Sequence, residues 1–338
     1  MSFRAEYLSD LARVTPATAQ ALALRLFRHQ ARHCAPYQQW LQALGCRPEQ
    51  VQRLEQVPFL PIEFFKTHEV VTVEPAEPWQ PVQTFRSSGT TQQQRSRHLL
   101  RDAPLYHEHA ARIFEQQYGP LSGWTFLALL PSYLEQGESS LVDMVEHFVR
   151  ASGQPQQQAF FLRDHAALLE ALQTAKREQP GRRLMLIGVT YALLDLLAAY
   201  PGHPALRLPD AVLETGGMKG RRREMIREEL HAELMAGFGQ PVIHSEYGMT
   251  ELLSQAYSPG HGRFWAPPAL QVLLREPSDP FSADFERAAG AISVVDLANV
   301  DSCAFLETRD LGRRHPDGSF EVLGRLDNSD IRGCSQLA

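Results

Sequence analysis

The most constraining feature of the chain is a series of strand-length segments that are apolar along their whole length. Phe126–Leu130, Leu184–Val189 and Ala211–Leu213 are such segments, and helical patterns separate them. A strand with one solvated face alternates apolar and polar residues, whereas a continuously apolar strand is buried on both faces. The sequence therefore predicts an α/β fold, in which helices cover both faces of a sheet.

Other segments complete the expected organisation. The prolines of Val57–Pro61 disfavour helix and predict an extended stretch there. Asp102 and Ser139 are placed to cap helices. Helices are expected within residues 1–50, after Asp102, after Ser139 and Ser140, from Tyr191, and over Arg222–Met235. Shorter strands are expected at Val242–His244, Ile292–Val295 and Phe320–Leu323, the last two in a smaller, mostly β subdomain spanning roughly residues 260–323.

Two polar motifs directly follow predicted strands. Thr215-Gly216-Gly217 comes after the strand at Ala211, and the motif Tyr247-Gly248-Met249-Thr250-Glu251 comes after the strand at Val242. Ligands of open α/β sheets bind at the carboxyl ends of the strands. Both motifs are therefore candidate binding elements.

A third motif suits a phosphate group. Ser87-Ser88-Gly89-Thr90-Thr91 combines four hydroxyls with one glycine. A phosphate needs short donors and a backbone that can approach it closely. A surface Ser/Thr turn explains the same letters equally well when the segment is taken alone.

Bulk properties narrow the class of protein. The net charge of −6 over 338 residues argues against a broad nucleic-acid footprint. The N-terminal segment lacks the pattern of a secretory signal, and the apolar stretch Tyr191–Tyr200 is too short to span a membrane. The four cysteines match no zinc or redox spacing, so we expect a cytoplasmic protein with reduced thiols.

The motifs together match the needs of an enzyme that activates a carboxylate with ATP. Glu251 supplies a hard oxygen ligand for Mg²⁺, and the Thr250 hydroxyl suits the α-phosphate. Tyr247 offers an aromatic face for a base, Gly216 and Gly217 allow close approach of a flat ring, and Asp310 can accept hydrogen bonds from ribose. Each residue has an ordinary explanation alone: a core tyrosine, a glutamate at a helix N-terminus, an aspartate in a turn.

The order of these motifs, continued by Thr308-Arg309-Asp310 and Gly324-Arg325-Leu326-Asp327, resembles the adenylate-forming superfamily. The resemblance implies the large domain of that superfamily, with mixed sheets covered by helices plus a small β subdomain. It implies ATP and Mg²⁺ as cofactors and Glu251 as the metal ligand. The implied nucleotide-binding residues are Ser87, Ser88, Gly89, Thr90, Thr91, Gly216, Gly217, Tyr247, Gly248, Met249, Thr250, Asp310 and Arg325.

The sequence departs from the superfamily at two motifs, and the residues after Asp327 are shifted by one relative to the common pattern. The phosphate loop continues with Gln92-Gln93-Gln94-Arg95, where glycine and then lysine are usual. The ribose motif has Arg309 where glycine is usual. These changes affect how tightly the loop is expected to bind the β- and γ-phosphates.

Nearly the whole chain resembles one family within it, the LuxE-type acyl-protein synthetases, which are long-chain fatty-acid–protein ligases. Only eleven residues follow Asp327, so the usual mobile C-terminal domain is expected to be lacking. We expect an adenylating catalytic domain over residues 1–323 and a hinge-derived tail over 324–338 that carries Cys334. The resemblance implies that Cys334 accepts the acyl group from acyl-AMP and passes it to a partner such as an acyl reductase. His244 is a possible lining residue of the substrate pocket.

Two alternatives stay open. The chain resembles phenylacetate–CoA ligase-like enzymes, which would make it an aryl or other carboxylate ligase that delivers to CoA or a carrier protein. The altered phosphate loop instead favours a catalytically silent nucleotide- or acyl-binding protein.

Overall fold

The computed structural model describes residues 2–87, 94–130, 138–155, 159–162, 164–216 and 225–326. The chain forms two compact units. Unit 1 contains residues 1–106, 249–255 and 265–338, and unit 2 contains residues 107–248 and 256–264.

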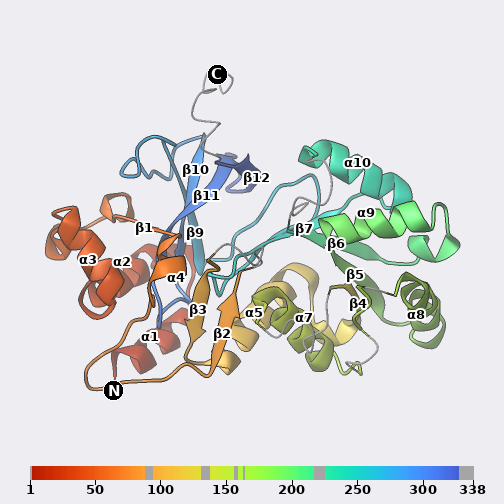
Figure 1. Cartoon of the computed structure of the whole chain (residues 1–338), viewed down its shortest axis with the longest axis horizontal. Coiled ribbons are helices and arrows are strands. Elements are labelled where there is room, and N and C mark those ends of the chain that lie inside the picture. Colours follow the sequence, from red (N-terminus) through yellow and green to blue (C-terminus); the bar gives the residue numbers. More distant parts are fainter. Residues whose placement is uncertain are drawn as a thin grey trace. The chain divides into compact units, whose positions relative to one another are not determined.

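Unit 2 is built on a five-stranded mixed sheet (Figure 1). The order is β4-β5-β6-β7-β8; the first four strands are parallel, and β8 is antiparallel to β7. The strands are β4 (Trp124–Leu129), β5 (Arg183–Val189), β6 (Ala211–Thr215), β7 (His244–Tyr247) and β8 (Ala256–Ser258). Every residue of β4 and β6 is buried, as expected for strands with both faces covered.

Helices cover both faces of this sheet. Phe114 and Tyr118 of α5 pack on Tyr257 of β8, whereas His231 of α10 lies beside Ser245 of β7. Tyr257 is paired in register with Glu246, which follows Ser245 in β7. Because successive residues of a strand point to opposite faces, Tyr257 and Ser245 lie on opposite faces of the sheet, and so do α5 and α10. The helices are α5 (Ala103–Tyr118), α7 (Ser140–Ala151), α8 (His165–Glu178), α9 (Thr190–Ala199) and α10 (Arg227–Phe238), with 3-10 turns η3 (Leu121–Gly123) and η5 (Pro204–Arg207).

Unit 1 holds a second five-stranded sheet, mostly antiparallel, and a separate two-stranded hairpin (Figure 1). Its order is β1-β11-β10-β9, and β12 pairs with a different stretch of the long strand β11. The strands are β1 (Leu60–Pro61), β9 (Leu270–Arg275), β10 (Ala289–Asp296), β11 (Phe305–Arg314) and β12 (Phe320–Arg325); β2 (Gln83–Arg86) and β3 (Arg97–Leu100) form the hairpin.

The N-terminal helices of unit 1 pack on β11 through aromatic side chains. Phe305 of β11 contacts Phe27 at a ring-centroid distance of 5.6 Å and Tyr37 at 6.1 Å, and all three residues are fully buried. The helices are α1 (Phe3–Leu11), α2 (Pro16–His33), α3 (Ala35–Ala43) and α4 (Phe64–Thr67), with 3-10 turns η1 (Pro48–Gln50) and η2 (Leu54–Gln56). No helix within the described parts of the chain is both long and apolar enough to cross a membrane.

The structure confirms the expected α/β class with mixed sheets and most of the expected elements. Two boundaries were wrong. β7 begins only at His244, because its pairing with β6 starts there. Helix α10 begins at Arg227, after Ile226 in an extended conformation, and ends at Gly239, which is left-handed with φ of 65°.

Candidate functional site

Buried Asp296 holds the segment that carries Thr250 and Glu251 within unit 1. Asp296 ends β10 and is fully buried. One of its carboxylate oxygens accepts hydrogen bonds from the backbone N–H groups of Leu253 and Ser254, at 2.7 and 2.9 Å. The other accepts from the Ser254 hydroxyl at 2.6 Å and from the Ala298 N–H at 3.0 Å. A side chain that gathers four donors fixes the path of the backbone around it.

The metal-ligand candidate Glu251 is 7% exposed and lies among groups that favour its ionised form. Its carboxylate accepts a hydrogen bond from Ser96, and its carbonyl oxygen accepts one from Asn299 at 2.8 Å. Burial raises the pKa of Glu251, and this effect exceeds the opposing effects of Ser96, Lys66 and Arg325. A cation bound at the carboxylate would offset the same cost of burial.

Ser96 belongs to the hairpin that flanks the candidate phosphate loop. The Ser87 hydroxyl accepts a hydrogen bond from the Ser96 N–H at 3.0 Å, and the Ser87 N–H donates to the Ser96 carbonyl at 3.1 Å. Arg95 donates to the Ser87 carbonyl. The two ends of the loop are thus held together. Four of the predicted phosphate-binding residues, Ser88, Gly89, Thr90 and Thr91, lie outside the described residues.

His98 of β3 fixes the backbone at Thr250. Its Nδ1 lies 2.8 Å from the Thr250 carbonyl oxygen, which can only accept, so Nδ1 carries the proton. Burial lowers the pKa of His98 to about 4, so the ring is neutral near pH 7. Met249 starts the turn, with its carbonyl accepting from the Leu252 N–H at 3.1 Å.

The ribose candidates Asp310 and Arg325 face each other across a strand pair. Asp310 of β11 is paired in register with Arg325 of β12, and Arg325 Nε lies 3.7 Å from Asp310 Oδ1. The Arg325 side chain is 74% exposed, whereas Asp310 is buried. Asp310 therefore lies within a strand rather than in a turn, and an exposed guanidinium stands beside its carboxylate.

In unit 2, a buried polar network holds the end of β6. Thr190 at the start of α9 has its hydroxyl 2.6 Å from the Gly216 carbonyl oxygen and 3.0 Å from Glu214 Oε2. Gly216 has a φ of 71°, a left-handed conformation that suits glycine. Burial alone would raise the pKa of Glu214, but hydrogen bonds from His231 and Ser245 and the charge of Arg227 lower it. Gly217 lies outside the described residues.

Tyr247 and Gly248 end the part of the motif that belongs to unit 2. Tyr247 is the last residue of β7, is 7% exposed, and packs on Phe264 at a ring-centroid distance of 6.0 Å. Gly248 is exposed. The chain passes from unit 2 to unit 1 between Gly248 and Met249.

His244 and Glu246 alternate along β7 and so point to the same face of the sheet, towards α5. His244 Nδ1 lies 3.3 Å from the Tyr118 hydroxyl. The Thr215 hydroxyl donates to Glu246 Oε2 at 2.5 Å. Burial lowers the pKa of His244 and raises that of Glu246 from 4.5 to about 7.

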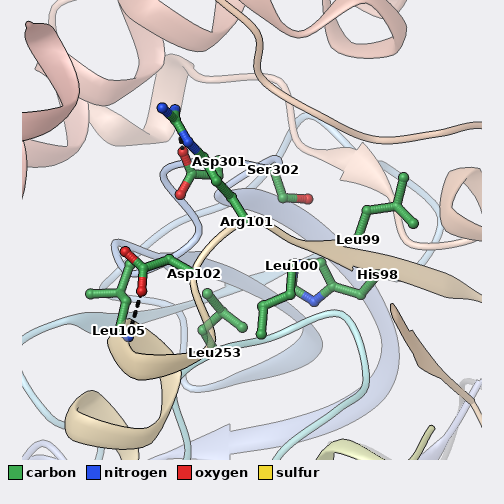
Figure 2. A pocket seen from close by; sticks show the side chains of 9 residues that line it. All are labelled: His98, Leu99, Leu100, Arg101, Asp102, Leu105, Leu253, Asp301 and Ser302. Atoms are coloured by element: carbon green, nitrogen blue, oxygen red, sulfur yellow. Dashed lines mark hydrogen bonds and ion pairs between the residues drawn. The ribbon is translucent and has the colours of Figure 1, made fainter. Parts of the chain in front are cut away.

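A small cavity in unit 1 lies beside His98. Figure 2 shows its lining, in which Arg101 points towards Asp301 and Asp102 accepts from the N–H of Leu105 at the start of α5. Its volume of about 10 Å³ is at the lower limit for one water molecule. The cavity is therefore no candidate for a nucleotide or acyl site.

The structure adds residues that the sequence analysis missed. Ser96, His98 and Asp296 are all buried, and each bonds to a residue of the segment 249–255. These contacts link positions far apart in the chain, so no local pattern in the sequence indicates them. Within the described ranges no group of three or more His, Cys, Asp or Glu side chains has the arrangement of a metal site. Cys334 lies outside those ranges.

No family model matches the chain, and no curated protein matches it. Among solved structures, it is similar to o-succinylbenzoate coenzyme A synthetase from Bacillus subtilis, whose structure contains AMP. The two are 17% identical with a TM-score of 0.49, and the alignment covers 76% of this chain and 65% of that protein. A likeness this distant assigns no activity to this chain.

Proposed function

We propose that the protein is an AMP-forming ligase that activates a carboxylate with ATP. The observation that carries this proposal is the environment of Glu251 in unit 1. Ser96, from the hairpin that flanks the serine- and threonine-rich loop, hydrogen-bonds to this buried carboxylate, and Lys66 and Arg325 act on it through their charges. Residues from three distant stretches of the chain thus surround one acidic group with donors and cations suited to phosphate oxygens.

A single carboxylate such as that of Glu251 suits Mg²⁺ bound together with a nucleotide. Mg²⁺ is usually held by one or two carboxylates together with substrate phosphates and waters, so a cluster of protein ligands is not required. When bound, the ion would neutralise charge that develops on the phosphate oxygens. The role of this chain is to hold Glu251 fixed through Asp296 and to favour its ionised form through the Ser96 hydrogen bond and the charges of Lys66 and Arg325.

The remaining roles are assigned by chemistry. Asp310 and Arg325 would hold the ribose hydroxyls, Thr250 the α-phosphate, and Ser87 to Thr91 the other phosphates. Tyr247 and Gly216, with Gly217, would contact the adenine. The carboxylate then attacks the α-phosphorus of ATP, the bond from that phosphorus to the oxygen bridging to the β-phosphate breaks, and pyrophosphate leaves, so that the mixed anhydride acyl-AMP remains.

We assign a long-chain fatty acid as the substrate and the thiol of Cys334 as the first acceptor. The Cys334 thiolate would attack the acyl carbon and release AMP, because acyl adenylates react readily with thiolates. An acyl reductase would then receive the acyl group. The resemblance of nearly the whole sequence to acyl-protein synthetases supports this assignment.

Intact-protein mass spectrometry tests the acceptor. The protein is incubated with MgATP and a series of fatty acids from octanoate to octadecanoate, with Cys334→Ser alongside as the matched variant. We expect an acyl mass that requires ATP, is removed by hydroxylamine and is absent from Cys334→Ser. An unmodified protein that still releases pyrophosphate would instead assign the acceptor to CoA or a carrier protein.

A further inference from the structure

Four side chains gather on the face of the unit 2 sheet that α5 covers. Thr215 and Glu246 are the last and the next-to-last residues of neighbouring parallel strands, so both lie at the carboxyl edge where open α/β sheets bind ligands. His244 and Tyr118 lie deeper on the same face. Glu246 is not among the site residues predicted from the sequence.

Glu246 is held through only one of its carboxyl oxygens. Oε2 accepts from the Thr215 hydroxyl at 2.5 Å, while Oε1 has no hydrogen bond from any residue in the described part of the chain. The side chain is half-buried rather than enclosed. Glu246 thus has an oriented carboxyl group with one oxygen available to another molecule.

The surroundings set the proton affinity of this group. Burial raises the pKa of Glu246 to about 7, the charge of Glu214 adds to the rise, and the Thr215 hydrogen bond opposes it. His244 and Tyr118 bring no compensating charge, because burial lowers the pKa of His244 and raises that of Tyr118. Tyr257 of β8 is paired in register with Glu246. A base whose pKa lies near the working pH is the most effective in proton transfer.

We propose that Glu246 is the general base of the acyl-transfer step, which takes the proton of the acceptor thiol. This inference rests on the proposed function. The ionised carboxyl accepts the S–H proton, and the sulfur electron pair forms a bond to the acyl carbon of acyl-AMP. The bond from that carbon to the phosphate oxygen breaks, AMP leaves as an anion, and Glu246 then releases its proton to water.

The test separates the two half-reactions in Glu246→Gln. The carboxylate that works best with the wild type is incubated with MgATP and either hydroxylamine or N-acetylcysteamine. Both assays use the Cys334→Ser background, because hydroxylamine also cleaves a Cys334 thioester. Hydroxamate formation then reports acyl-AMP without a thiol proton, and thioester formation with N-acetylcysteamine reports the proposed step. We expect thioester formation to fall about 100-fold in Glu246→Gln, while hydroxamate formation stays near the wild-type rate. Glu233→Gln, which removes an exposed carboxylate of α10, controls for the change in charge and should leave both rates unchanged.

The pH profile distinguishes a base from a structural residue. In the wild type, thioester formation should fall as the pH drops through about 7, because the base becomes protonated. Thr215→Val removes a hydrogen bond that lowers the pKa of Glu246, so the fall should move to higher pH. Equal losses of hydroxamate and thioester in Glu246→Gln, or an unchanged thioester rate, would overturn the assignment. A wild type that forms no hydroxamate with any carboxylate would instead overturn the proposed function and the assignment with it.

Discussion

At the scale of single residues, the candidate site combines buried carboxylates with exposed cations. Asp310 and Glu251 are both buried, whereas Arg325 is largely exposed beside Asp310. An exposed ion pair contributes little to folding, typically about 0–1 kcal/mol. The pair is therefore expected to contribute little to stability, and the proposed contact of Arg325 with the ribose is a separate effect that can be tested.

Arg325→Ala tests this contact. We expect the KM for ATP to rise about 10-fold or more, because a hydrogen bond to a charged group contributes roughly 1.5–3 kcal/mol. The free energy of unfolding should change by less than about 1 kcal/mol. Arg313→Ala is the matched control, since Arg313 of β11 is also exposed and pairs with Glu321. An equal rise in KM in both variants would contradict the assignment.

For Asp296 we predict the opposite pattern, in which a substitution lowers the stability of the fold. Asp296→Ala leaves the N–H groups of Leu253, Ser254 and Ala298 without their acceptor in the core. We expect a loss of about 3–5 kcal/mol in the free energy of unfolding, measured by denaturant titration. Amide hydrogen exchange at Leu253 and Ser254 should also become faster. Unchanged exchange at these two amides would show that Asp296 does not hold the segment.

At the scale of elements, the hairpin β2–β3 links the loop to the metal-ligand candidate. Its strands place Ser87 and Ser96 opposite each other, and Ser96 in turn bonds to Glu251. The ionisation of Glu251 therefore depends on a hydrogen bond from the hairpin as well as on burial. A change in the hairpin is expected to alter the titration of Glu251.

Ser96→Ala tests this link through the pH dependence of pyrophosphate exchange. The Ser96 hydrogen bond lowers the pKa of Glu251, so its loss should raise that pKa and move the acid limb of the activity to higher pH. Each unit of this shift should cost about 10-fold in rate on the acid limb and little above it. Ser302→Ala loses a buried hydrogen bond of similar kind, to the Val70 carbonyl, far from Glu251 in the sequence. It should lower stability without moving the acid limb, and an equal movement in both variants would contradict the link.

The elements also show what sequence could and could not predict. The strands of unit 2 were predictable because residues such as Phe126 and Ile187 are buried on two-sided strands that leave continuous apolar runs. The hairpin was not, because β2 and β3 have four residues each, with few apolar side chains. Asp310 looked like a turn residue because Gly312 follows it, yet pairing with β12 keeps it in a strand. The role of Asp296 depends on contacts more than forty positions away along the chain.

At the scale of the whole molecule, the motif Tyr247 to Glu251 is divided between the two units. Tyr247 and Gly248 belong to unit 2, and Met249 to Glu251 belong to unit 1. Its first residues end a parallel strand, and its last residues are fixed by Asp296 and His98. The motif is thus held by different contacts at its two ends, each within its own unit.

ATP–pyrophosphate exchange shows whether the protein activates a carboxylate with ATP. Labelled pyrophosphate is incubated with the protein, MgATP and each carboxylate in turn, with Glu251→Gln alongside. We predict that label enters ATP only when a carboxylate is present, most strongly with long-chain fatty acids. In Glu251→Gln the exchange should fall at least about 100-fold, because the Mg²⁺ ligand is lost. Exchange that needs no carboxylate, or equal exchange in Glu251→Gln, would contradict the account, as would no exchange with any carboxylate.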